Sequence, residues 1–197
     1  MFVREVMTTP AVTVTPGTSL KESIRLLHEH SITAMPVVDD AGQLVGVLSE
    51  ADVLRDTVAA DRRAHERPIE VTVPAVHLVA TDVMTHLPIS VSPEDDVVQA
   101  VEFLVSTQVK SLPVVSAGRV VGMISRRDVI AVLARHDALI EAEIDEELRQ
   151  AGVECTVVVN EGVVELQDAD GPESLRIARV LASRVPGVIG VSPGHAT

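Results

Sequence analysis

The chain has 197 residues and a formal net charge of −13, and its apolar content of 46% is almost entirely aliphatic. It contains no Trp, no Tyr and only two Phe. This composition is too apolar for an intrinsically disordered chain, and it supplies cores for one large domain or two to three small ones. The lack of aromatic residues argues against modules that stack exposed bases, and the negative charge argues against nucleic acid as a partner.

Several further classes are disfavoured by the sequence. No apolar run approaches the roughly 20 residues that span a bilayer, and the charged first residues do not resemble a signal peptide. The single cysteine, Cys155, excludes an internal disulfide and a cysteine-rich zinc site. No catalytic triad order, glycine-rich phosphate loop or metal-ligand spacing is present. We therefore expect a cytoplasmic, non-enzymatic protein with no catalytic residues, no metal site, no obligatory cofactor and no membrane partner.

A sequence repeat organises most of the chain. Each copy opens with Val-Met-Thr, continues through a β-prone run that ends at Pro, and then carries a Pro-Val-Val run and a Gly-x-x-Ser-x-x-Asp motif. The four blocks begin at Val6, Val12, Met35 and Gly46 in the first copy, and at Val83, Ile89, Leu112 and Gly122 in the second. Because the blocks keep their order and spacing, we interpret the repeat as a duplication whose two copies pack together.

Each copy predicts the order strand, helix, hairpin, helix. In the first copy, residues 12–14 alternate as a short strand, and Ser19 begins a capping box and an amphipathic helix. Residues 36–48 are typical of a hairpin, and Ser49 is placed to cap a second helix. The charged and then β-prone segment 61–79 is expected to be a linker that crosses to the second copy.

The Gly-x-x-Ser-x-x-Asp motif is the strongest candidate for a ligand site. Ser49 and Ser125 offer a hydroxyl at a helix start, where free backbone N–H groups favour phosphate. Asp52 and Asp128 lie one turn further on, where a carboxylate can accept both hydrogen bonds of a ribose diol. The same spacing also forms a plain capping box without any ligand, and both interpretations remain open.

These motifs together resemble a tandem pair of CBS domains, the cystathionine-β-synthase-type module also called a Bateman module. The resemblance covers about residues 1–136. It implies a mixed α/β (α+β) fold with two β-α-β-β-α units related by a pseudo-twofold axis, at residues 1–60 and 80–136, with the linker 61–79 between them. It also implies a homodimer and up to two clefts for an adenosine-containing ligand such as AMP, ADP, ATP or an S-adenosyl compound. Modules of this kind sense ligands and are not usually enzymes.

The resemblance also implies a set of ligand-binding residues for each copy. The Asp side chains would bind ribose, the Ser side chains would contact phosphate or ribose, and mostly aliphatic residues would line the adenine pockets. The first site would contain Thr8, Val12, Ile32, Thr33, Ala34, Pro36, Ser49 and Asp52. The second site would contain Thr85, Ile89, Val109, Lys110, Ser111, Pro113, Ser125, Arg126, Arg127 and Asp128.

The two sites differ in charge. Arg126 and Arg127 lie within the second motif with Lys110 on the facing strand, whereas Glu50 occupies the first motif. Because Arg suits phosphate and Glu repels it, we expect di- or triphosphate ligands at the second site. The first site would hold a less charged ligand or stay empty.

The segment 137–197 does not repeat the unit and predicts a small domain of order α-β-β-α-β. Its hairpin around residues 160–162 and its ending at residues 185–191 resemble the BON domain. That resemblance implies association with phospholipid or another macromolecular surface. Asp and Glu greatly outnumber Arg in the segment, which argues against anionic lipid and favours an unidentified protein partner.

Two hypotheses follow from the sequence. In the first, an adenine nucleotide binds the paired repeats, and dimer geometry or the C-terminal domain passes that state to a partner. In the alternative, the repeats form a ligand-free structural and dimerisation scaffold, and the BON-like domain binds a partner or a membrane surface.

Overall fold

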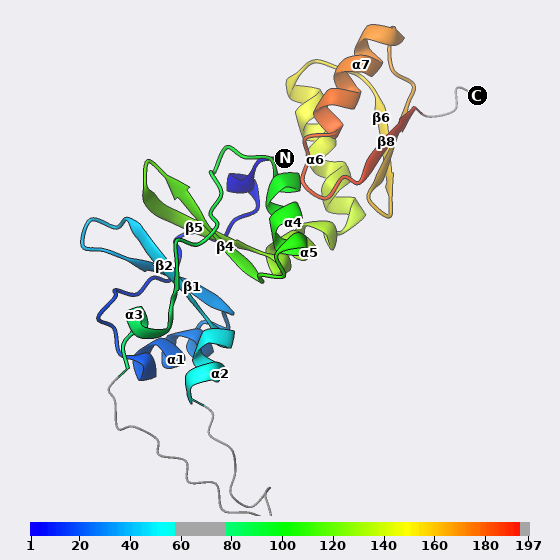
Figure 1. Ribbon diagram of the computed structural model, residues 1–197. Helices are drawn as coiled ribbons and strands as arrows, with labels where there is room; N and C mark the ends of the chain where they lie inside the picture. Colours follow the sequence, from blue (N-terminus) through cyan, green and yellow to red (C-terminus); the bar gives the residue numbers. More distant parts are fainter. Residues whose placement is uncertain (58–77, 194–197) are drawn as a thin grey trace, which may run out of the picture. The chain divides into compact units, whose positions relative to one another are not determined.

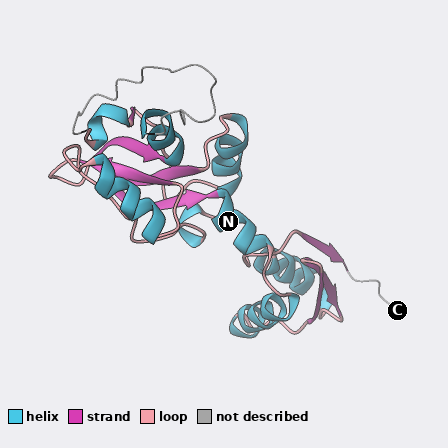
Figure 2. Cartoon of the chain, turned by 90° about the horizontal axis from the view of Figure 1, so that it is seen from below, coloured by secondary structure: helices cyan, strands magenta, loops and turns pink. Residues whose placement is uncertain are grey.

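The structure of the protein is a computed structural model that describes residues 1–57 and 78–193 (Figures 1 and 2). The chain divides into two compact units. One unit is Met7–Ser125, and the other combines Met1–Val6 with Arg126–Thr197. Helices and strands occur in both units, which confirms the mixed α/β class. The predicted linker 61–79 lies, apart from its last two residues, outside the described part of the chain.

The first copy folds largely as its sequence predicts. The side chain of Ser19 accepts a hydrogen bond from the backbone N–H of Glu22 at 3.2 Å and begins the first long helix. The helices of this copy lie on one side of its hairpin (Figure 1). Its elements are α1 (Leu20–Glu29), β1 (Ala34–Val38), β2 (Leu44–Ser49) and α2 (Glu50–Thr57), with β1 and β2 antiparallel.

The second copy repeats the hairpin and its flanking helices. Asp96 caps its long helix by accepting from the backbone N–H of Val98 at 2.9 Å. Its last helix falls in the other compact unit. The elements are α3 (Ala80–Val83), β3 (Thr85–His86), α4 (Val97–Ser106), β4 (Ser111–Ser116), β5 (Arg119–Ser125) and α5 (Arg126–Leu133), and a short 3-10 helix (Val3–Glu5) opens the chain.

The strands expected at residues 12–14 and 89–91 are shorter than predicted. Each is reduced to a single parallel bridge, between Val14 and Val37 in one copy and between Val91 and Val114 in the other. Prolines lie within four residues on both sides of each bridge. Proline lacks the N–H that a sheet ladder needs, so the pairing cannot extend.

The opening segment of each copy pairs with the hairpin of the other copy, which the sequence did not predict. Thr8 forms an antiparallel bridge with Met123 in β5. In return, Thr85 of β3 pairs with Val47 of β2, so that the first sheet has the order β1-β2-β3. The buried cluster beneath that sheet likewise includes Met84 from the second copy. Neither sequence copy is therefore a self-contained structural unit.

The glycine of each repeated motif makes this exchange possible. A Cβ atom added at Gly46 would collide with the side chain of Met84 and lie 3.0 Å from the backbone oxygen of Thr85. A Cβ added at Gly122 would lie 2.8 Å from Sδ of Met7 and also crowd the backbone next to it. Because glycine has no side chain, it leaves room for the opening segment of the other copy.

The C-terminal part forms the predicted α-β-β-α-β order. Its strands β6 (Thr156–Asn160), β7 (Val163–Gln167) and β8 (Gly190–Pro193) make a sheet of order β6-β7-β8, with β6 and β7 antiparallel and β8 parallel to β7. The carboxylate of Asp137 accepts from the backbone N–H groups of Glu161 and Gly162 at 2.7 and 2.9 Å and holds the β6–β7 turn. The elements are α6 (Asp137–Gln150), β6 (Thr156–Asn160), β7 (Val163–Gln167), α7 (Gly171–Ala182) and β8 (Gly190–Pro193).

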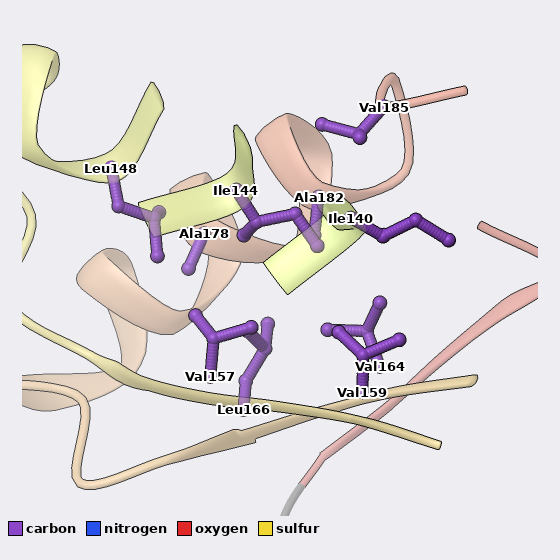
Figure 3. Close-up of a cluster of buried hydrophobic side chains, with 10 residues drawn as sticks. All are labelled: Ile140, Ile144, Leu148, Val157, Val159, Val164, Leu166, Ala178, Ala182 and Val185. Atoms are coloured by element: carbon purple, nitrogen blue, oxygen red, sulfur yellow. The ribbon is translucent and has the colours of Figure 1, made fainter. Parts of the chain in front are cut away.

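One apolar core holds this C-terminal part together. Both helices lie on the same face of the sheet (Figure 2), and Figure 3 shows their side chains pointing toward those of the strands. Burial alternates along β6 and β7, as a sheet with one covered face requires. The cluster contains Ile140, Ile144, Leu148, Val157, Val159, Val164, Leu166, Ala178, Ala182 and Val185. Residues 1–57 and 78–193 contain no helix with the length and hydropathy of a membrane-spanning segment.

Candidate functional site

A cavity of about 390 Å³ opens at the start of α2, entirely within the unit Met7–Ser125. Its volume falls within the range of roughly 300–1,000 Å³ that is typical of small-molecule pockets. Both sequence copies contribute to it. The lining residues are Thr33, Ala34, Val47, Ser49, Glu50, Ala51, Asp52, Thr85, Leu87, Pro88, Ile89, Thr107, Gln108, Val109, Lys110, Ser111, Leu112 and Pro113.

The first Ser-x-x-Asp motif forms one wall of the cavity as a closed capping box. The carboxylate of Asp52 accepts from the hydroxyl of Ser49 at 2.6 Å and from the backbone N–H of Ser49 at 3.0 Å. Both bonds use the same oxygen, Oδ2, while Oδ1 lies 3.7 Å from a guanidinium nitrogen of Arg55. Asp52 is only 7% exposed. The motif thus holds a buried carboxylate at the cavity wall, and its helix start is already capped without a ligand.

Polar contacts join the two copies across this cavity. The hydroxyls of Thr33 and Ser111, from different copies, are 3.0 Å apart, whereas the backbone N–H of Glu50 donates to the backbone oxygen of Thr33 at 3.0 Å within the first copy. The ammonium of Lys110 lies 3.1 Å from Oε2 of Glu50. The two links of Glu50 tie the start of α2 to the residues that directly precede β1 and β4.

The structure regroups the residues that the sequence assigned to two separate sites. From the expected first site, the cavity contains Thr33, Ala34, Ser49 and Asp52. From the expected second site, it contains Thr85, Ile89, Val109, Lys110, Ser111 and Pro113. The lining of this cavity therefore does not follow the grouping by sequence copy, and the physical reason is the exchange of opening segments, which brings Thr85 beside Val47.

The remaining residues of the expected first site do not line this cavity. Thr8 is bonded to β5 through Met123, and Pro36 is fully buried within β1. Ile32 packs against the core beneath the first sheet, and Val12 is half-buried before the Val14 bridge.

The second Ser-x-x-Asp motif spans the boundary between the two compact units. Ser125 ends β5 in one unit, whereas Arg126, Arg127 and Asp128 form the first turn of α5 in the other. They are absent from the lining of the cavity described above. A second ligand site at this motif stays a prediction from the sequence.

Two lining residues that sequence reasoning missed have an unusual backbone. Leu87 and Gln108 have φ angles of 51° and 59° and lie in the left-handed region. Leu87 is also 95% exposed at the cavity. Because this conformation usually belongs to Gly or Asn, a Leu and a Gln gave no sequence signal for it.

The cavity suits a ligand that combines an apolar plane with hydroxyl groups. Ala34, Val47, Ile89 and Pro113 offer aliphatic surface, and a buried carboxylate can accept hydrogen bonds from a diol. Over the part of the chain that the structure describes, no group of three or more His, Cys, Asp or Glu side chains could hold a metal ion.

Comparison with known proteins supports a repeated module. The family model for the CBS domain matches residues 3–58 and 79–135. The chain is 33% identical over 133 residues to the chloroplastic CBS domain-containing protein CBSX1 of Arabidopsis thaliana, in an alignment that covers 59% of this chain and 56% of that relative.

Solved structures share the fold. The crystal structure of CBSX2 in complex with AMP matches with a TM-score of 0.55 and 31% identity, covering 66% of this chain and 93% of that one. The CBS domain pair of protein MJ0100, in complex with 5′-methylthioadenosine and S-adenosyl-L-methionine, matches with a TM-score of 0.54. It is 22% identical and covers 67% of this chain and 94% of its own, so that this second likeness concerns the fold alone.

Proposed function

Since the chain belongs to the CBS domain family and carries two matched copies of the domain, we propose that it is a non-enzymatic regulatory protein that binds an adenosine-containing ligand. The ligand site is the cavity at the start of α2. The observation that carries the proposal is the buried Asp52 carboxylate facing a space with aliphatic walls.

The chemistry of the wall matches the two halves of a nucleoside. Aliphatic side chains can cover both faces of an adenine without aromatic stacking, and Asp52 can accept from the ribose hydroxyls through its second oxygen. The related CBSX2 structure contains AMP. We extend that ligand class, AMP, ADP or ATP, to this chain as a proposal, with the more phosphorylated ligands assigned to the motif at Ser125 and Asp128.

Ligand binding can regulate only if it distinguishes two states of the protein. The cavity is built from both sequence copies, so that a ligand bound there would alter how the copies pack. We propose that the chain forms a homodimer whose geometry responds to this change. Val98 and Val105 on α4 are 63% and 67% exposed and supply apolar surface for such an interface.

The C-terminal part is proposed as the output domain. Its α-β-β-α-β order agrees with the BON-like expectation, and its acidic composition favours a protein partner over an anionic membrane. The cytoplasmic location expected from the sequence stays a prediction.

One observation favours the alternative, a ligand-free scaffold. The Ser49–Asp52 capping box is complete in itself, so that this motif needs no ligand to stabilise α2. A scaffold of this kind would use the same fold for dimerisation alone.

A thermal-shift panel separates the two hypotheses. Adenosine, AMP, ADP, ATP, NAD and S-adenosylmethionine are added to the full chain, because a specific ligand raises the melting temperature by mass action. Asp52→Ala should abolish the shift of any ligand that binds the cavity. Asp95→Ala is the matched control, since Asp95 also accepts from the backbone N–H three residues before it, that of Ser92 at 2.7 Å, but lies outside the cavity. A panel without any shift would favour the scaffold.

A further inference from the structure

The cavity contains an ion pair that joins the two sequence copies. Nζ of Lys110, from the second copy, lies 3.1 Å from Oε2 of Glu50, the first residue of α2. Both side chains line the cavity, and they are 64% and 45% exposed. Both charged groups are therefore accessible to a ligand that binds in the cavity.

The balance of charge in the cavity lining is negative. Its ionisable residues are Glu50, Asp52 and Lys110, so that two carboxylates face one ammonium. Asp52 already accepts from Ser49 twice. Among the described residues of the lining, Lys110 is thus the one cation available to an anionic ligand, and it is engaged by Glu50.

A phosphate group would disturb this arrangement. A phosphate that binds Lys110 would compete with Glu50 for the ammonium and would lie beside that carboxylate, so that two anions would repel each other. A nucleoside without phosphate leaves the pair intact. Glu50 and Asp52 both line the cavity, so that a ligand held by Asp52 shares this space with the Glu50–Lys110 pair.

We propose that the Glu50–Lys110 pair sets the charge selectivity of this cavity, so that it takes an adenosine-type nucleoside whose 5′ group carries no phosphate. The inference rests on the proposed function, since it concerns the ligand of the same cavity. It identifies Glu50 as a specificity-determining residue that disfavours nucleotides, because its carboxylate competes with their phosphate for the ammonium of Lys110.

Isothermal titration of the full chain with adenosine and with AMP tests the inference. Asp128→Ala serves as the background, so that the predicted second motif does not contribute, and the wild-type chain is titrated in parallel. The variants are Glu50→Gln, Lys110→Gln and, as a matched loss of one carboxylate outside the cavity, Glu102→Gln on the exposed side of α4. Circular dichroism checks that each variant is folded.

The measured quantity is the ratio of the association constants for AMP and adenosine. Glu50→Gln should raise this ratio by about fivefold. In this variant the phosphate of AMP can form an exposed ion pair with Lys110 without competition from the Glu50 carboxylate. Lys110→Gln should lower the ratio, and Glu102→Gln should leave it as in the parent. An unchanged ratio in Glu50→Gln, with both ligands bound, would overturn the inference while the proposed function stands. Failure of both ligands to bind any chain would reject the proposed function and the inference with it.

Discussion

Thr8 and Met123 exchange two backbone hydrogen bonds, with the N–H of Thr8 donating to the oxygen of Met123 at 2.8 Å and the N–H of Met123 donating back at 3.0 Å. The two residues come from different sequence copies. With the reciprocal pairing of Thr85 and Val47, this contact joins the hairpin of each repeat to the opening segment of the other. The cavity depends on the same exchange, because Thr85 and Ile89 of the second copy line it beside residues of the first copy.

The exchange of opening segments predicts that even a small side chain at Gly46 destabilises the fold. Gly46→Ala would place a methyl group against Met84 and 3.0 Å from the backbone oxygen of Thr85, which should lower the free energy of unfolding by about 1–3 kcal/mol through overpacking. Gly17→Ala is the control, because nothing lies within 4 Å of its added Cβ. Urea unfolding curves of both variants measure the difference, and equal midpoints would show that the β2–β3 contact is dispensable.

Much of the fold could be predicted because its signals are local. The capping serine at Ser19, the two hairpins and the C-terminal order each depend on residues close together in sequence. The exchange of opening segments was missed because it is a choice between partners. Two repeats with the same pattern offer two similar strands for each opening segment, and no local pattern distinguishes its own copy from the other.

The candidate site likewise combines residues that the sequence predicts with residues that only packing brings there. The motif residues Ser49 and Asp52 could be found from their spacing, and the cavity contains both. The position of Lys110 beside Glu50 could not be found, since it follows from packing between copies. Leu87 was equally hidden, because its left-handed backbone is set by the fold and not by a glycine.

The role of Ser49 can be separated from simple helix capping. Ser49→Ala removes the hydroxyl that bonds Asp52, and Ser19→Ala removes the cap of α1, which lies outside the cavity. Each should cost about 1 kcal/mol of stability. Only Ser49→Ala should also reduce the thermal shift given by the adenosine-containing ligand that stabilises the parent chain most. A comparable reduction in Ser19→Ala would mean that the ligand response reports general stability.

The thiol of Cys155 should be a slow nucleophile in the folded protein. Burial raises the pKa of this thiol, and the nearby carboxylates of Asp168 and Asp145 raise it further. Alkylation with iodoacetamide should therefore reach its half-maximal rate at a higher pH in the native chain than in denaturant.

The same pKa shift fixes the sign of a stability change. Because the unfolded thiol ionises at a lower pH than the folded one, the free energy of unfolding is unaffected below the unfolded pKa and falls as the pH rises above it. Cys155→Ser should remove this contribution. Coincident alkylation profiles for native and denatured protein would contradict the raised pKa.

The C-terminal core should be separable from the ligand site. Ile144 is 0% exposed at the centre of that core (Figure 3), so that Ile144→Ala should lower the stability of the C-terminal part by about 2–5 kcal/mol through the cavity it leaves. Leu139→Ala, on the same helix but 58% exposed, should cost far less. None of the residues that line the proposed ligand cavity belongs to this part. In differential scanning calorimetry, Ile144→Ala should therefore lower the transition of the C-terminal part while the ligand-induced shift of the remaining transition persists. Loss of that shift would show instead that ligand binding requires an intact C-terminal core.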